Sequence, residues 1–116
     1  MTHEMKLQPK YFDFVRNGSK RIELRLFDDK RKAILLGETI KFLKEPGKTE
    51  NLEVTVTGLL RYSKFEDLIK DFDISVLADS SITKEDLLND LEKFYSKKDQ
   101  ENFGVLGIRF KLHNFH

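Results

Sequence analysis

The chain has 116 residues and no cysteine, which excludes disulfides, thiol nucleophiles and thiolate metal sites. A hydrophobic share of 39% with ten Phe is not typical of a disordered tail, and no apolar run approaches the ~18 residues of a membrane span. We therefore expect a soluble, cytoplasmic protein with no membrane association. A single domain over residues 1–116 is expected, because such a chain buries enough surface for one core but not two.

The net charge of +1 conceals an uneven distribution of charged residues. Residues 1–32 contain nine Lys or Arg and five Asp or Glu, whereas residues 63–102 contain six basic and eleven acidic residues. Localised positive charge attracts polyanions even in a nearly neutral protein. Well-solvated surfaces give the same pattern, so charge alone does not identify a partner.

The first part of the chain predicts a strand, a short helix and further strands. His3 to Gln8 is the first expected strand, and Pro9 suits the first position of a helix, where its missing N–H costs nothing. Asn17-Gly18 ends this helix, whose apolar face carries Tyr11, Phe14 and Val15. Lys20 to Phe27 alternates as a strand does, with one face formed by Ile22, Leu24 and Leu26 and the other by Arg21, Glu23 and Arg25.

Residues 28–62 predict a charged loop followed by a hairpin. Asp28 to Lys32 is interpreted as a loop, although its basic run can also contact phosphates. Thr39 to Lys44 and Leu52 to Tyr62 are expected to pair as antiparallel strands. Pro46-Gly47 fits the central positions of a type II turn between them.

The remaining residues predict two helices and a last strand. Ser63 and Glu66 match a capping box at the start of one helix, and Thr83 and Asp86 match another. Apolar stripes follow both, formed by Phe65, Leu68, Ile69 and Phe72 and then by Leu87, Leu88, Leu91, Phe94 and Tyr95. Lys97 to Asn102 is interpreted as a polar loop, and Val105 to Phe115 as the closing strand. Strands at both ends with helices between them favour an α+β protein with a mixed sheet or small barrel.

The densest polar cluster lies at the start of the second expected strand. Strand alternation places Glu23 and Arg25 on one side, ~7 Å apart, and Lys20 in the preceding turn can join them. A neighbouring Arg keeps a carboxylate ionised, and such a trio offers donors and an acceptor to a base edge, a ribose or a phosphate. A solvated strand face with surface ion pairs would give the same pattern. Periodicity alone leaves both interpretations open.

The run Gly18-x-Lys20-x-x-Glu23-x-Arg25 resembles the G-x-K-x-x-E-x-R signature of the ASCH family, the ASC-one homology domain of the PUA-like superfamily. Its context is similar too, since it follows a short aromatic helix, and Gly37 to Phe42 and the closing strand come later. The resemblance spans nearly the whole chain and suggests a small single-domain member of the bacterial or phage type. It implies a PUA-like small mixed β-barrel with about three flanking helices.

The resemblance also implies a cleft beside the barrel that binds RNA or a modified nucleoside. The expected ligand-binding residues are Lys20, Arg21, Glu23 and Arg25, without a cofactor or metal. Tyr62, at a strand end, can stack on a base, although a Tyr packed beneath the following helix is the simpler interpretation. We expect a monomer or weak dimer, with any protein partner unknown.

Two alternatives to binding alone remain open. Some small members are amidohydrolases that release the acetyl group of N4-acetylcytidine with the signature Lys, a Thr and a later carboxylate. Glu23 stands at that Thr position here, and Lys20 matches. The later carboxylate should fall just before the last expected helix, where Asp79 is the nearest acid, so the candidate catalytic residues are Lys20, Glu23 and Asp79. A ribonuclease would use residues such as Tyr11, Tyr62 and Ser63. A protein-interaction module is the second alternative, favoured if the acidic segment 63–102 covers the cleft.

Overall fold

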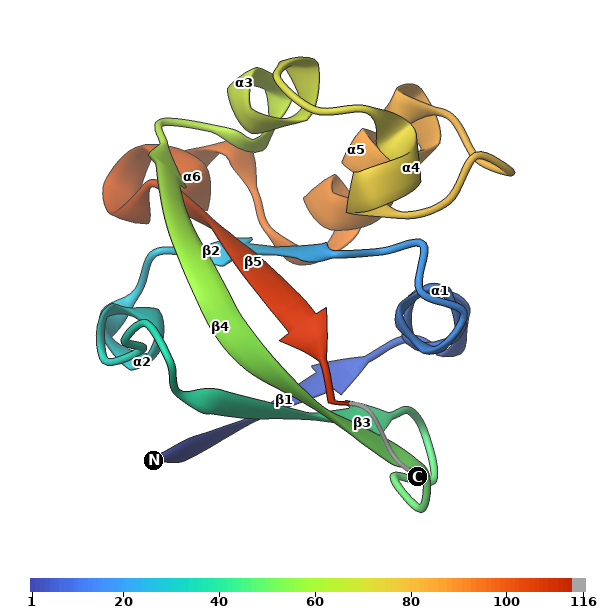
Figure 1. The fold of residues 1–116 in the computed structure, drawn as a ribbon. Helices are drawn as coiled ribbons and strands as arrows, with labels where there is room; N and C mark the ends of the chain where they lie inside the picture. The colour runs from blue at the N-terminus through green and yellow to red at the C-terminus, as the bar shows by residue number, and fades with distance from the viewer. Residues whose placement is uncertain (114–116) are drawn as a thin grey trace.

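Five strands form one strongly curled mixed sheet in the computed structural model, which describes residues 1–113 (Figure 1). The strand order is β1-β3-β4-β5-β2, with β1 parallel to β3 and all other neighbours antiparallel. The strands are β1 (Thr2–Leu7), β2 (Ile22–Leu26), β3 (Thr39–Lys44), β4 (Asn51–Tyr62) and β5 (Val105–Leu112). The expected α+β fold with a small barrel-like sheet and the β3–β4 hairpin are confirmed.

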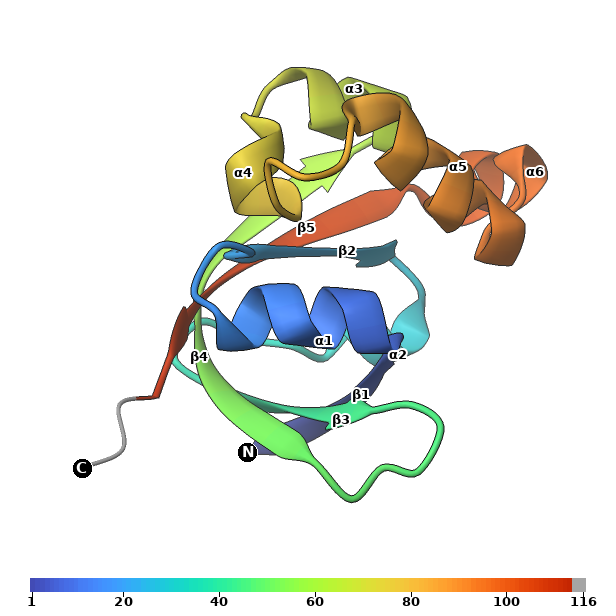
Figure 2. The same ribbon diagram turned by 90° about the vertical axis from the view of Figure 1, so that its right-hand side faces the viewer.

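Six helices surround the sheet within residues 1–113: α1 (Pro9–Arg16), α2 (Asp29–Lys32), α3 (Phe65–Lys70), α4 (Ile74–Leu77), α5 (Lys84–Phe94) and α6 (Lys97–Phe103). Helix α1 lies on the open side of the curled sheet, between β2 and the β1–β3 pair (Figure 2). Helices α3 to α6 gather beyond β2 and β5 at one end of the molecule (Figures 1 and 2). The two edge strands β1 and β2 therefore face one another across a gap that α1 partly fills.

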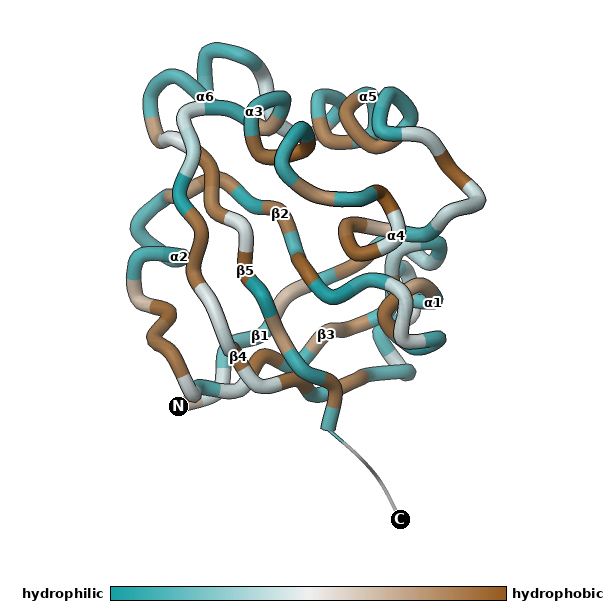
Figure 3. The backbone as a smooth tube through the Cα atoms, turned by 45° about the horizontal axis from the view of Figure 1, so that its top comes forward, coloured by the Kyte–Doolittle hydropathy of each residue, from teal (hydrophilic) through white to brown (hydrophobic). Residues whose placement is uncertain are grey.

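The buried side chains form two clusters, so the expectation of a single core is wrong. Neighbours on β5 show why: Val105 and Leu106 point to opposite faces of the strand and belong to different clusters. One cluster fills the curled sheet under α1, around Phe12, Phe42 and Phe110. The other lies between β2 and helices α3 to α5, with Leu24 and Phe65 among its members. Along β2, hydrophobic residues that belong to the second cluster alternate with hydrophilic ones (Figure 3).

Three short helices occur where the sequence predicted loops or nothing regular. Asp28 accepts a hydrogen bond from the backbone N–H of Arg31 (3.1 Å) and so begins α2 in the expected loop. Ser96 in the same way accepts from the N–H of Asp99 (3.0 Å) and begins α6 within the expected polar loop. Helix α4 follows Asp73, which caps it. High polarity conceals α2 and α6, because a short helix with a capping side chain needs little apolar surface. Helix α4 is apolar but only four residues long, too short to show a helical repeat.

One of the two predicted capping boxes forms. Thr83 and Asp86 exchange side-chain-to-backbone hydrogen bonds of 3.0 Å at the start of α5. The box at Ser63 is wrong, because Lys64 precedes α3 and makes no side-chain cap. The backbone N–H of Phe65 instead donates to the side-chain oxygen of Gln100 (3.0 Å), a contact with α6 that local sequence does not contain.

The loop of the hairpin and the end of the last strand also differ from expectation. The type II turn at Pro46-Gly47 is wrong, since Lys48 rather than Gly47 has a positive φ, of 59°. Strand β5 ends at Leu112, and Phe115, the predicted end of the strand, lies outside the described residues.

Candidate functional site

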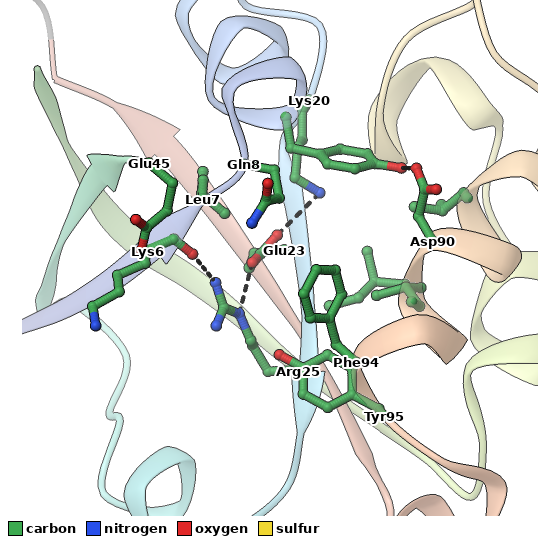
Figure 4. A pocket seen from close by; sticks show the side chains of 14 residues that line it. Lys6, Leu7, Gln8, Lys20, Glu23, Arg25, Glu45, Asp90, Phe94 and Tyr95 are labelled. Atoms are coloured by element: carbon green, nitrogen blue, oxygen red, sulfur yellow. Dashed lines mark hydrogen bonds and ion pairs between the residues drawn. The ribbon is translucent and has the colours of Figure 1, made fainter. Parts of the chain in front are cut away.

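A cleft of about 260 Å³ opens at the gap between the two edge strands (Figure 4). The end of β1 and the start of α1 form one side, β2 forms the floor, and α5 forms the opposite wall. Residues from these elements and from the segments just before β2, after β3 and after α5 line it: Lys6, Leu7, Gln8, Tyr11, Lys20, Glu23, Leu24, Arg25, Glu45, Leu87, Asp90, Leu91, Phe94 and Tyr95. The cleft thus combines residues that lie far apart in the sequence.

Lys20, Glu23 and Arg25 meet at the floor of this cleft. The Nζ atom of Lys20 lies 3.2 Å from Oε1 of Glu23, and Nε of Arg25 donates to Oε2 of the same carboxylate at 2.7 Å. Lys20 is only 1% exposed and Glu23 only 6%. The solvated strand face considered for these residues is therefore wrong, because α1, α5 and β1 enclose that side of β2.

The turn after α1 places Lys20 beneath the cleft. Helix α1 ends at Arg16 with Asn17 as its C-cap, and Gly18 with a φ of +85° reverses the chain, a conformation that favours glycine. The ammonium of Lys20 then donates to the backbone carbonyls of Ile22 (2.7 Å) and Leu77 (2.8 Å) besides contacting Glu23. Burial lowers the pKa of Lys20, and the charge of Glu23 partly opposes that shift. An ammonium has three N–H donors, and three acceptors surround this one.

Glu23 holds its charge through its two cationic neighbours. Burial alone would raise the pKa of Glu23, but the charges of Lys20 and Arg25 outweigh it and the pKa is lowered. Burial likewise opposes the charge of Arg25, and the attraction of Glu23 prevails, so that the pKa of Arg25 is raised. The result is an ionised carboxylate fixed between two cations.

Arg25 also connects the two edges of the sheet. Its Nη2 atom donates to the backbone carbonyl of Lys6 in β1 at 2.7 Å, while its Nε contacts Glu23 in β2 (Figure 4). These two bonds use two of the five N–H donors of a guanidinium. Tyr95 at the end of α5 lies beside Arg25 as well.

Tyr11 and Asp90 form a second polar pair in the cleft, which was not predicted from the sequence. The hydroxyl of Tyr11 donates to Oδ2 of Asp90 at 2.6 Å, and Lys10 contacts the same oxygen at 2.9 Å. Burial, reinforced by the bond to Asp90, raises the pKa of Tyr11. A signal existed, because Asp90 falls one turn from Leu87 and Phe94 and so interrupts the apolar stripe of α5.

Phe94 departs from the core role predicted for its stripe. It is 62% exposed while lining the cleft, whereas Leu87 of the same stripe is buried. Phe94 and Tyr95 lie together on the α5 side, with ring centroids 6.5 Å apart. The cleft therefore offers accessible aromatic surface above its charged floor (Figure 4).

The other expected site residues lie outside the cleft lining. Arg21 is exposed and contributes backbone contacts, with its N–H donating to Val76 (2.8 Å) and its carbonyl accepting from Phe110 (3.0 Å). Tyr62 donates to Asp71 (2.6 Å) beside α3. Asp79 accepts from the N–H of Ser81 (2.9 Å) in the loop after α4. The structure thus brings together Lys20, Glu23 and Arg25 but not these three.

Within residues 1–113, no three His, Asp or Glu side chains are arranged to hold a metal ion. In the same part of the chain, no helix combines the length and apolar character needed to cross a bilayer.

Comparison with known proteins places this site in a family context. The family model described as ASCH domain matches residues 5–113. The crystal structure of the hypothetical protein PH0355 is similar, with a TM-score of 0.84 and 30% identity over 97% of this chain and 100% of that one. The solution structure of protein PF0455 from Pyrococcus furiosus has a TM-score of 0.76 and 25% identity over 99% of this chain and 100% of that one. The search of curated proteins found no match.

Proposed function

Because this chain belongs to the ASCH domain family, we propose that its cleft binds a nucleoside unit of RNA, or a modified nucleoside, between Phe94 and the Glu23–Arg25 pair. Family membership supports a general RNA-binding role for the domain. The assignment of the cleft itself depends on one observation. An exposed aromatic ring and a fixed pair of charged hydrogen-bonding groups share a small opening.

The dimensions of the cleft suit a single nucleoside. Its volume of about 260 Å³ lies just below the ~300–1,000 Å³ typical of sites for drug-sized ligands. A cleft of this size accommodates one base with its sugar and excludes a duplex. Sequence-tolerant recognition of single-stranded RNA commonly stacks unpaired bases on Phe, Tyr or Arg. Phe94 and Tyr95 provide such a surface.

The charged floor supplies the hydrogen bonds that distinguish one base from another. The Glu23 carboxylate already accepts from Lys20 and Arg25, and each of its oxygens has a further lone pair for an amino group such as that of cytosine. Arg25 has N–H donors beyond those that contact Glu23 and Lys6. Since internal contacts hold both groups in place, little conformational entropy is lost when a base binds.

The proposal is tested by changing the exposed aromatic residue rather than the buried cluster. Phe94→Ala should weaken binding of short single-stranded RNA and of the four ribonucleosides about fivefold or more, since one stacked base is worth ~1–3 kcal/mol. Phe103→Ala is the matched control, because Phe103 is also exposed (46%) and does not line the cleft. Binding is measured by NMR titration, with N4-acetylcytidine as the modified probe.

Two results would contradict the proposal. One is equal loss of affinity in Phe94→Ala and Phe103→Ala, which would indicate non-specific contact with exposed rings. The other is the absence of any perturbation of residues 20–26 by RNA, nucleosides or N4-acetylcytidine. Perturbation of these backbone signals in the parent protein would also argue against the interpretation as a protein-interaction module without a nucleic-acid ligand.

A further inference from the structure

A second hollow, of about 240 Å³, adjoins the cleft on the side away from α5. The two share Lys6 and Arg25, and the second also reaches Lys30 and Arg31 of α2. In Figure 4 the guanidinium of Arg25 lies between Tyr95 on one side and the Lys6 backbone on the other. A ligand that occupies the cleft can therefore extend past Arg25 into this hollow.

The hollow is basic in character. Its lining contains four cationic side chains, Lys6, Arg25, Lys30 and Arg31, and one carboxylate, that of Glu4. Arg25 is paired with Glu23 and Arg31 with Asp28, whereas among residues 1–113 neither Lys6 nor Lys30 forms an ion pair.

Two details of these residues favour an anionic occupant. Glu4 lies opposite Lys41 in the β1–β3 register, so a cationic residue of the adjacent strand neighbours the one carboxylate of the hollow. The Nε atom of Arg31 is buried and has no hydrogen-bond partner among the described residues, although Nη1 of the same side chain contacts Asp28 at 3.0 Å. The buried Nε cannot reach a ligand, so the terminal N–H groups of Arg31 that Asp28 does not use are the donors that match a phosphate oxygen.

We propose that this hollow binds the phosphate attached to the nucleoside in the cleft, so that the site is built for a nucleotide of an RNA strand rather than for a free nucleoside. The inference rests on the proposed function, because it needs a base to lie in the cleft. It adds a second contact, made by Lys6, Lys30 and Arg31, to the phosphate group. In this arrangement the contacts to the base select its identity, and the contacts to the phosphate position the nucleotide.

The test compares each ribonucleoside with its 3′- and 5′-monophosphates, and inorganic phosphate is a separate arm. The parent protein should bind one of the two monophosphates at least tenfold more tightly than the nucleoside at low salt, and the difference should shrink as salt is added. Lys30→Ala should remove most of this difference without changing the affinity for the nucleoside. Lys32→Ala is the matched control, since Lys32 is on the same exposed helix and does not line the hollow.

The possible results separate this inference from the proposed function. Equal affinity for nucleosides and both monophosphates would overturn the phosphate site and leave nucleoside binding intact. An equal loss of the preference for a monophosphate in Lys30→Ala and Lys32→Ala would also overturn it, because the preference would then reflect non-specific electrostatic attraction. Inorganic phosphate that binds as tightly as the nucleotides would show an anion site independent of the cleft, which also contradicts the inference. If neither nucleosides nor nucleotides bind, both the inference and the proposed function fail.

Discussion

Arg25 in β2 donates a hydrogen bond to the backbone carbonyl of Lys6 in β1, although these strands are the opposite edges of the sheet. The same guanidinium holds Glu23 at 2.7 Å. Arg25 thus joins the two edges of an incompletely closed barrel and anchors the floor of the cleft at the same time. A side chain with this double role should affect both stability and binding when it is changed.

Arg25→Lys should show both effects. One ammonium cannot reproduce the geometry of a guanidinium that reaches Glu23 and the Lys6 carbonyl together. We expect a loss of about 1–2 kcal/mol in the free energy of unfolding, as for one lost buried hydrogen bond, and nucleoside affinity reduced tenfold or more. Urea titration and NMR binding measure the two effects. Arg21→Lys, at an exposed residue outside the cleft, should change neither quantity measurably, and a similar change in both variants would contradict the role of Arg25.

Lys20→Met should lower the free energy of unfolding more than the same change at an exposed lysine. It removes a cation from buried Glu23 and leaves the carbonyls of Ile22 and Leu77 without their donor. Breaking one side of a buried ion pair typically costs ~3–5 kcal/mol, so the expected result is a large fall in the urea midpoint.

Lys10→Met provides the control for this prediction, because its contact with Asp90 is partly exposed and such pairs contribute ~0–1 kcal/mol. In addition, the losses in the free energy of unfolding caused by Lys20→Met and Glu23→Gln should not be additive, since the two side chains contact each other. Additive losses would show that Lys20 and Glu23 stabilise the protein independently.

The stability of the protein should decline on acidification through Glu23. The pKa of this carboxyl is lowered from its usual value of 4.5 because the charges of Lys20 and Arg25 outweigh burial. The unfolded chain therefore binds a proton at Glu23 more readily than the folded protein does. The ionised Glu23 contributes to the free energy of unfolding above about pH 4.5, and this contribution is lost as the pH falls through the lower pKa of the folded protein. Urea midpoints of the parent should decrease across this range.

Glu23→Gln separates the contribution of Glu23 to the pH dependence of stability from the contributions of the other acidic residues. The variant should be less stable at neutral pH, and the stability gap to the parent should narrow as the pH falls below about 4.5. Urea titrations of both proteins between neutral pH and the acid limit of folding measure the gap. A gap that stays constant with pH would mean that Glu23 is not ionised in the folded protein.

N4-acetylcytidine should bind without being converted to cytidine. A general base needs a neutral amine with a free lone pair. Burial lowers the pKa of Lys20, but three acceptors surround its Nζ atom, so the lone pair of a neutral amine would face an acceptor oxygen rather than a substrate; Asp79 lies outside the cleft. Chromatography of long incubations at high enzyme concentration checks the expectation. Release of cytidine that disappears in Lys20→Arg would support the amidohydrolase alternative instead.

Short-range features of the fold followed from local sequence patterns. Pro9 and Gly18 delimit α1, the alternation from Ile22 to Leu26 predicted β2, and the Thr83–Asp86 pair began α5 as expected. Each of these depends on residues only a few positions apart, whose preferences are set by backbone sterics and capping hydrogen bonds. The same patterns failed at Ser63, where a distant residue, Gln100, satisfies the backbone.

The candidate site could be predicted only in part. The proximity of Glu23 and Arg25 follows from strand alternation, because side chains two residues apart share a face. The burial of that face does not, since it depends on where α1, α5 and β1 pack. The wall of the cleft was missed for the same reason: Tyr11 and Asp90 are 79 residues apart and meet only after folding.

By itself, the sequence determined which residues could form a helix, a strand or an ion pair, because these properties depend on neighbours along the chain. The tertiary structure alone decided that Lys20 and Glu23 are buried, that Phe94 is exposed and that Arg25 reaches Lys6. The curling of the sheet brings its two edges together, and α5 forms a wall of the cleft beside β2. The charged groups converge there because the fold encloses them and aligns side chains from separate elements.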